Sequence, residues 1–287
     1  MELSKINLGA GALHHELVAA VGGACPRGWL LIAHGLLGSG GNFRTLGRKL
    51  VQRRPEWGVA LVDLRLHGRS RGVPPPHTIA AAAADLAQLA AALAAVDHPP
   101  RALMGHSLGG KVVLAARATH PAWLLDTWVL DSSPGPVSAA SSSNGTDVSR
   151  VLDALVSVPR QYRRRQDMID ALTTAGLDRF TATWLAQNLE REEDGLVLRL
   201  DLPALRALFE DSAAVDLWPA ALAPAPGRVN VIAGGRSSMI PPSDQDRLRA
   251  GGVPVHVLPR AGHFVHVDAP GDVVDLLAKG LAEPVLK

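Results

Sequence analysis

The residues with the clearest capacity for chemistry are 105–109, which read Gly-His-Ser-Leu-Gly. They follow a short apolar run, 102–104, and precede a helix-forming run at 111–118. A serine flanked by glycines at this spacing, where a strand turns into a helix, is typical of a nucleophile elbow, whose strained backbone lifts the hydroxyl clear of the sheet. The alternative is a chance Gly-Ser-Gly pattern in a loop. Ser107 is the candidate nucleophile, and the choice between the two interpretations depends on whether the sequence also supplies a base and an acid.

A serine hydroxyl needs a base to take its proton, and the base needs a third group that fixes its tautomer. His263 is the candidate base, because it lies in Ala-Gly-His-Phe-Val-His (261–266), just past the last expected strand. His266 is the alternative base. The two histidines could also suggest a metal site, but no third ligand stands at a recognisable spacing and His14 and His15 are equally isolated, so we expect no metal.

The acid of such sites usually lies in the turn after the strand expected at 229–233, but that turn contains no carboxylate. Ser238 stands where one is expected. Asp131 instead ends the strand that follows the nucleophile strand, and neighbouring parallel strands lie only about 4.8 Å apart, so its side chain can reach the histidine. Asp131 could alternatively organise a turn with the Ser-Ser-Pro that follows it. Asp244 and Asp246 are the other candidate acids, although they fall in the next expected helix.

A tetrahedral intermediate also needs backbone donors for its oxyanion. The N–H of Leu108, after the nucleophile, is one candidate, and the N–H of Leu36 is the other, because it lies in a glycine-rich loop (34–39) that follows a strand. His34 is expected to support this loop rather than to transfer protons. The competing interpretation is a phosphate-binding loop, but no GxxxxGK[ST] or GxGxxG pattern is present.

The candidate catalytic residues can act together only if the fold brings the strand ends that carry them to one edge of a sheet. Short apolar runs alternate with helical stretches from residue 29 onward, which predicts βα units and a mostly parallel sheet. We expect strands at 29–34, 59–64, 102–106, 127–130, 229–233 and 253–258, and helices near 43–53, 79–96, 108–119, 242–250 and 271–280.

The alternation breaks between residues 134 and 213. Helical segments are expected there at 147–157, 161–175 and 178–190, after a serine-rich stretch at 138–143. We therefore expect a helical cap at 134–213, inserted between two parts of an α/β core at 1–133 and 214–287. A basic cluster in this region, Arg160, Arg163, Arg164 and Arg165, is interpreted as a solvated helix face, with attraction of an anionic group as the alternative.

Composition excludes several classes of protein. Of the 287 residues, 47% are hydrophobic and 20% are charged, which is typical of a globular chain. The net charge of only +2 gives no case for a nucleic-acid partner. Cys25, the single cysteine, allows neither an intramolecular disulfide nor a thiol metal site. The longest apolar stretch, 79–96, is alanine-rich and contains Asp85, so it indicates a packed helix, and no transmembrane segment or secretory signal is expected.

With these residues considered together, the chain resembles the α/β-hydrolase superfamily, and within it the esterase group of abhydrolase domain-containing protein 11 and the YbfF-type esterases. The stretches that carry the resemblance are HGLLGSGGNF (34–43), DLRLHGRS (63–70), GHSLGGK (105–111), VLDSSP (129–134) and AGHFVH (261–266). This group takes its triad acid at the end of the strand after the elbow, which matches Asp131. Leu66 departs from the pattern, because the group often has asparagine there.

The resemblance implies a serine hydrolase of acyl esters or thioesters that works through an acyl-enzyme and requires no cofactor. It also implies an intracellular protein, with a mitochondrial or plastid location as one possibility. The acyl chain, the leaving group and the oligomeric state are left open. The rival functions are a non-catalytic receptor for small ligands on the same fold and a lipase acting on acylglycerols.

Overall fold

The computed structural model describes residues 13–284 except for 21, 23–24, 120 and 137–147. Its centre is a seven-stranded sheet of order β1-β3-β2-β4-β5-β9-β10, in which only β1 runs antiparallel to its neighbour. This confirms the predicted mostly parallel sheet. The strands are β1 (His15–Val18), β2 (Gly28–Ala33), β3 (Trp57–Val62), β4 (Pro100–His106), β5 (Asp126–Leu130), β9 (Arg228–Gly234) and β10 (Val255–Leu258).

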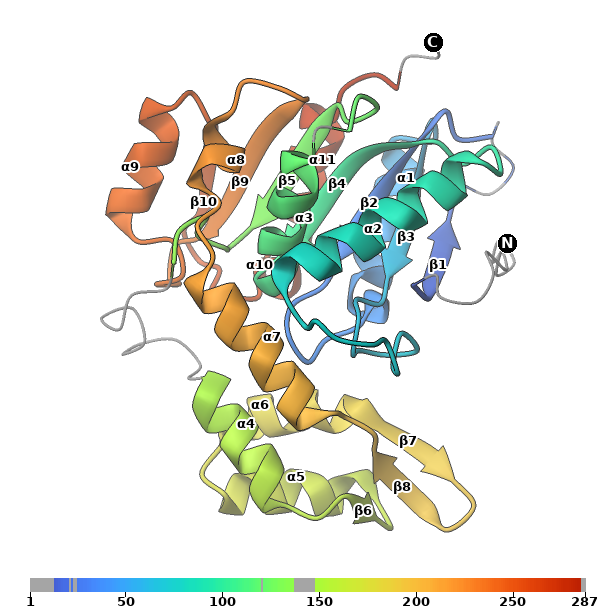
Figure 1. The fold of residues 1–287 in the computed structure, drawn as a ribbon, viewed down its shortest axis with the longest axis vertical. Coiled ribbons are helices and arrows are strands. Elements are labelled where there is room, and N and C mark those ends of the chain that lie inside the picture. Colours follow the sequence, from blue (N-terminus) through green and yellow to red (C-terminus); the bar gives the residue numbers. More distant parts are fainter. Residues whose placement is uncertain (1–12, 21, 23–24, 120, 137–147, 285–287) are drawn as a thin grey trace.

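Helices cover both faces of the sheet, as the unbroken apolar runs of the central strands require. Successive side chains of a strand point to opposite faces, so Leu30 and Ile32 pack against one pair of helices and Leu31 and Ala33 against another. Figure 1 shows one pair in front of the sheet and the other behind it. The front pair is α2 (Ile79–Ala94) and α3 (Leu108–Ala118), and the rear pair is α1 (Arg44–Arg53) and α11 (Pro270–Gly280).

The remaining elements of the core lie around β9 and β10. Helix α8 (Trp218–Leu222) contacts α3, and α9 (Pro242–Ala250) contacts β10. The short helix α10 (Val265–Asp268) follows the loop that contains His263. A single 3-10 turn, η1 (Gly40–Phe43), precedes α1. Of these elements, α10 lies near the edge of the sheet at which the parallel strands end (Figure 1).

A second layer lies beyond the carboxyl ends of the parallel strands (Figure 1). Helix α7 (Leu202–Ala214) runs from this layer back to the core, where it contacts α2 and α3. The layer consists of α4 (Val148–Ser157), β6 (Gln161–Tyr162), α5 (Arg165–Thr174), α6 (Arg179–Leu185), η3 (Ala186–Asn188), β7 (Leu189–Glu192) and β8 (Gly195–Leu198). The serine-rich stretch at 138–143 falls outside the described residues.

The layer contains helices as expected, but β6, β8 and β7 also form a small antiparallel sheet that was not expected. The helix expected at 178–190 ends at Leu185, and the chain then forms a hairpin from Leu189 to Leu198. An Asp-Gly pair at the centre of a hairpin favours the turn, because glycine accepts a positive φ at little cost. Here the pair is offset by one position: Glu192 pairs with Gly195, so the turn residues are Glu193 and Asp194, and Gly195, with φ 142°, begins β8. The Asp194–Gly195 pair was the sequence signal from which this hairpin could have been predicted.

All four arginines of the basic cluster are exposed, as expected of a solvated face, and three of them also have partners within this layer. Arg160 donates a hydrogen bond to the carbonyl of Leu200 over 2.6 Å, and Arg165 donates one to the carbonyl of Ala186. Arg164 pairs with Asp167. Arg160 and Arg165 therefore also connect segments of the layer.

Contacts between the two layers fix where the second one lies. Nδ2 of Asn188 donates a hydrogen bond to the carbonyl of Leu37, at 3.0 Å, and Arg71 forms an ion pair with Glu190. Within the described residues, no helix is both long and apolar enough to cross a membrane.

Candidate active site

The candidate nucleophile lies at the sharp turn between β4, which ends at His106, and α3, which begins at Leu108. Ser107 has φ 53° and ψ −118°, a combination that costs free energy for any residue with a side chain. Its N–H donates a hydrogen bond to the carbonyl of Leu130 on β5 over 3.0 Å. The backbone therefore has the strained form expected of an elbow.

The two glycines of the pentapeptide serve close packing rather than an unusual φ. The positive φ belongs to Ser107, and neither Gly105 nor Gly109 is among the residues with one. A Cβ on Gly105 would lie 2.0 Å from the carbonyl oxygen of Gly109, and a Cβ on Gly109 would lie 2.3 Å from that of Ala33. The glycines thus permit the sharp turn through close packing, because they let α3 lie against β4 and β2.

Asp131 directly follows β5, the strand next to the nucleophile strand, and its side chain is 1% exposed. Its Oδ2 lies 2.8 Å from Nδ1 of His263, and its Oδ1 accepts the N–H of Gly234 over 2.9 Å. The hydroxyl of Ser237 also donates to Oδ2, at 2.5 Å. The buried carboxylate thus has three hydrogen-bond donors, one of which is the candidate base.

The alternative acids lie elsewhere. The carboxylate of Asp244 accepts the hydroxyl of Ser133 over 2.6 Å, and Asp246 pairs with Arg249 on the surface of α9. Within the described residues, Asp131 is the carboxylate that hydrogen-bonds His263. Ser238, at the position where an acid was expected, has a buried hydroxyl with no hydrogen-bond partner there.

His106 and His266 surround the candidate base without contacting the acid. Nε2 of His106 donates to the backbone carbonyl of His263 at 2.8 Å, and burial lowers the pKa of His106 well below its usual value. The ring of His266 stacks on Phe43 with centroids 4.2 Å apart, and burial lowers its pKa to about 3. In the described part of the chain, no group of three or more His, Cys, Asp or Glu side chains is placed to hold a metal ion.

The glycine-rich loop after β2 is held by two buried histidines. Nε2 of His34 accepts the N–H of Leu64 at 3.0 Å and its Nδ1 donates to the carbonyl of Gly35 at 2.7 Å. Nε2 of His67 accepts the N–H of Leu37 at 3.0 Å. Because each Nε2 accepts an N–H, both imidazoles are neutral, and burial lowers the pKa of both, that of His67 to about 3. His34 supports the loop, as expected.

This loop comes close to the elbow. A Cβ on Gly35 would lie 3.0 Å from Nδ1 of His106 and 3.4 Å from Cβ of Ser107. Across the described residues, no protein acceptor is found for the N–H of Leu36 or of Leu108. Both donors are therefore available to an oxygen bound at Ser107.

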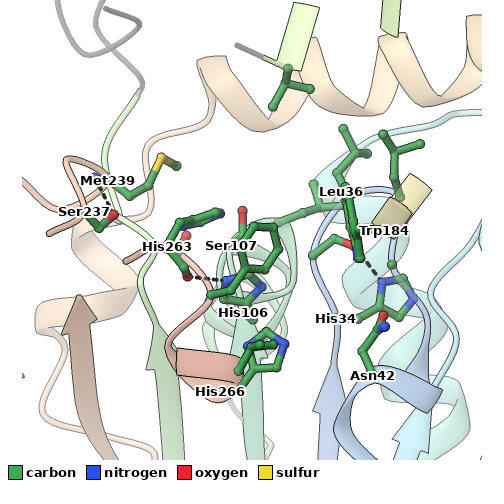
Figure 2. Close-up of a pocket in the computed structure, with 18 of the residues that line it drawn as sticks. His34, Leu36, Asn42, His106, Ser107, Trp184, Ser237, Met239, His263 and His266 are labelled. Carbon is green, nitrogen blue, oxygen red and sulfur yellow. Dashed lines mark hydrogen bonds between the residues drawn. The ribbon is translucent and has the colours of Figure 1, made fainter. Parts of the chain in front are cut away.

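The candidate catalytic residues lie around a cavity of about 440 Å³. Ser107, His263, Leu36 and Leu108 all line it, while Asp131 lies behind His263. Figure 2 shows His263 and Leu36 on opposite sides of Ser107, with the hydroxyl directed toward the cavity. The structure thus brings together all five candidate residues, whose catalytic roles stay predictions.

Sequence reasoning gave no role to three further residues of the site: His67, His106 and Ser237. The sequence signal for His67 was its position: like His34, 33 positions earlier, it is a histidine that comes soon after an expected strand. His106 lies within the pentapeptide itself. Ser237 carries no local signal, because its role depends on the carboxylate of a different strand.

The fold and this cavity define the class of protein. Residues 30–276 match the model of the Alpha/beta hydrolase family, so the chain belongs to that family. It is 28% identical to sn-1-specific diacylglycerol lipase ABHD11 of Mus musculus over 88% of this chain and 80% of that protein. It is 25% identical to esterase YbfF of Escherichia coli (strain K12), over 88% and 92% of the two chains.

Solved structures show the same fold. A marine microorganism esterase superposes with a TM-score of 0.78 at 22% identity, over 94% of this chain and 99% of that one. E-2-(acetamidomethylene)succinate hydrolase superposes with a TM-score of 0.73 at 18% identity, over 96% and 97%. These comparisons confirm the predicted α/β-hydrolase fold and the resemblance to the two esterase groups.

Proposed function

We propose that this chain is a serine hydrolase of carboxylic esters or thioesters that works through an acyl-enzyme. The observation that carries the proposal is the hydrogen bond between Asp131 and His263, at 2.8 Å, beside a cavity that also contains the strained Ser107. Relatives named as an esterase and as diacylglycerol lipases support the same chemistry.

In the first half-reaction, Oγ of Ser107 attacks the acyl carbonyl carbon while Nε2 of His263 takes its proton. Nε2 is free for this role because Nδ1 faces Asp131. The N–H groups of Leu36 and Leu108 stabilise the oxyanion. The bond to the leaving oxygen or sulfur then breaks, the leaving group takes the proton from His263, and the acyl group remains on Ser107.

In the second half-reaction, His263 takes a proton from water as the water oxygen attacks the acyl carbon. The ester bond to Ser107 breaks, and the proton returns to Oγ. The carboxylic acid leaves, and the enzyme is restored without an external cofactor.

In this proposal residues 134–213 act as one cap, inserted between core segments 1–133 and 214–287. The cap and α7 supply part of the cavity wall, including Val148, Trp184 and Phe209. Acyl selection would then depend on the cap, whereas bond cleavage would depend on the core.

A lipase that acts on acylglycerols is the second candidate. Two apolar side chains that line the cavity are largely exposed, Phe180 at 61% and Val267 at 53%. Exposed apolar side chains at a cavity rim suit a lipid substrate. The relatives named as diacylglycerol lipases favour the same alternative.

The test is fluorophosphonate labelling followed by mass spectrometry, with Ser107→Ala as the control. The proposal requires the label on Ser107 and turnover of at least one ester in a chain-length panel of esters, acyl thioesters and diacylglycerols. A protein that binds acyl ligands but releases product no faster than Ser107→Ala would be a receptor. Preference for diacylglycerols within the panel would identify the lipase.

A further inference from the structure

The cavity at Ser107 has two chemically different walls. Aromatic and aliphatic side chains of the cap and of the loop after β2 form most of one wall: Leu36, Leu37, Val148, Phe180, Trp184 and Phe209. The uncharged polar side chains of Thr181, Thr183 and Gln187 also belong to this wall. Side chains from α3 and from the loops after β5 and β9 form the other, polar wall: Lys111, Ser132, Ser133, Arg236, Ser237 and Ser238. In Figure 2, Ser237 and Leu36 lie on opposite sides of Ser107.

The lysine and arginine side chains that line the cavity are not balanced by acidic ones. Lys111 and Arg236 line it, whereas no aspartate or glutamate appears among its lining residues. Within the described part of the chain, the guanidinium of Arg236 has neither an ion pair nor a hydrogen bond. A cavity with two cations and no acidic side chain attracts negative charge.

Lys111 is the more informative of the two cations because it is only 5% exposed. It lies one helical turn after Ser107, and residues four apart occupy the same face of a helix. One of its three N–H donors bonds the carbonyl of Gly135, at 2.7 Å. No described carboxylate lies within 4.0 Å of its Nζ, although Asp216 and Asp244 attract it from farther away.

A buried ammonium without a close counter-ion is costly unless something compensates it. The polar wall offers one further unsatisfied group, the buried hydroxyl of Ser238. Burial also lowers the pKa of Lys111 to about 8, which leaves it mostly charged at neutral pH. An anionic group bound between Lys111 and Arg236 would satisfy all of these groups.

We propose that the cavity selects esters or thioesters that carry an anionic group of carboxylate size a few atoms from the scissile carbonyl, bound by Lys111 and Arg236. This inference rests on the proposed hydrolase function and narrows its substrate class. The apolar wall opposite would hold the uncharged part of the substrate.

The test compares anionic esters with their neutral counterparts. For an anion on the acyl side, the pairs are the monomethyl and dimethyl esters of succinate, glutarate and adipate, with release of methanol measured. For an anion on the leaving side, the pair is O-acetylated 3-hydroxypropionate and its methyl ester, with release of acetate measured. The readout is the ratio of kcat/KM for the anionic substrate to that for its neutral partner.

We expect a ratio above one for at least one pair in the wild-type protein. We also expect about a tenfold or larger fall of that ratio in Lys111→Met, a smaller fall in Arg236→Met, and retention in Lys111→Arg. Arg260→Met is the matched control, because Arg260 is exposed and does not line the cavity. Arg236→Met keeps the test decisive if Lys111→Met does not fold, since Arg236 is exposed.

Two other outcomes separate this inference from the proposed function. If Ser107 is labelled and the neutral esters turn over, but no pair shows a ratio above one or both variants leave the ratio unchanged, the anion site is wrong and the hydrolase stands. If Ser107 resists labelling and no ester of either kind is hydrolysed, the hydrolase is wrong, and the anionic preference is wrong with it.

Discussion

The hydroxyl of Ser237 donates a hydrogen bond to Oδ2 of Asp131 over 2.5 Å, on the same oxygen that faces Nδ1 of His263 at 2.8 Å. Ser237 lies in the turn after β9, where the acid of such sites usually stands. The hydroxyl of Ser237 in turn accepts the N–H of Met239, at 3.2 Å. The turn that lacks an acid therefore holds in place the acid supplied by β5.

Removing this support should impair catalysis without removing any reacting group. In Ser237→Ala, the carboxylate of Asp131 loses one of three donors and holds His263 less firmly, so we expect kcat to fall about tenfold with little change in KM. Steady-state kinetics on one neutral ester measures both constants. Ser237→Thr keeps the hydroxyl and should recover most of the loss. Equal kcat values for the wild type and Ser237→Ala would show that Gly234 and His263 suffice to fix the carboxylate.

Replacing the acid itself should be far more damaging. Asp131→Asn keeps the shape of the side chain but cannot stabilise a charged imidazole, so we expect kcat to fall by about three to four orders of magnitude. Asp246→Asn is the control, because that carboxylate pairs with Arg249 on the surface. Near wild-type activity in Asp131→Asn would exclude Asp131 as the acid.

The preference for anionic esters should depend on pH through Lys111, whose pKa burial lowers to about 8. Asp216 and Asp244, from the segment before α8 and from α9, act in the opposite direction and favour its charge. As the pH rises through about 8, Lys111 loses its proton and the ratio of kcat/KM for anionic over neutral esters should fall. The ratio cancels the pH dependence of every step that the two substrates share. Lys111→Arg should keep the ratio constant up to pH 9.5, and a wild-type ratio that is equally constant would contradict the assignment.

The buried histidines should make the fold sensitive to acid. Burial lowers the pKa of His34, His67, His106 and His266 in the folded state, to about 3 for His67 and His266. The unfolded chain binds protons on these groups below about pH 6.5 and the folded chain does not, so the free energy of unfolding should be largest above that pH and decrease as the pH falls toward 3. His67 and His266 each contribute a slope that approaches about 1.4 kcal/mol per pH unit in the middle of that window.

Urea unfolding at pH 7.5, 6.5 and 5.5 measures this dependence. His67→Gln removes one titrating group yet retains an acceptor for the N–H of Leu37, so its dependence on pH should be shallower than that of the wild type. Parallel curves for the two proteins would mean that His67 is already accessible to protons in the folded state.

The close packing of the elbow predicts a large difference between two glycine substitutions. In Gly105→Ala the new Cβ would lie 2.0 Å from the backbone oxygen of Gly109, which cannot rotate away, and we expect a loss of about 3 kcal/mol or more. Gly271→Ala, in α11, meets no atom within 4 Å and should be neutral or stabilising, since alanine favours a helix. Thermal unfolding of both variants checks this, and similar Tm values would contradict the packing argument.

The sequence was sufficient for the features that depend on local pattern. The apolar runs located the parallel strands, and the position of Asp131 at the end of its strand placed its carboxylate within reach of His263. It was insufficient where a role depends on a partner distant in the chain. Ser237 has a function only because Asp131, 106 positions away, points at it. The hairpin at 189–198 was missed because β7 is mostly charged and β8 is a four-residue apolar run, so neither shows the alternation that marks a strand.

The position of the acid on β5 also bears on how such an enzyme can diversify. Because no reacting group occupies the turn after β9, substitutions at Arg236 and Ser238 need not displace the carboxylate that serves His263. Mutation could therefore exchange one class of acyl substrate for another there while proton transfer remains intact. In engineering terms, Arg236 and Ser238 are the positions at which a small library would alter selectivity at the least risk to turnover.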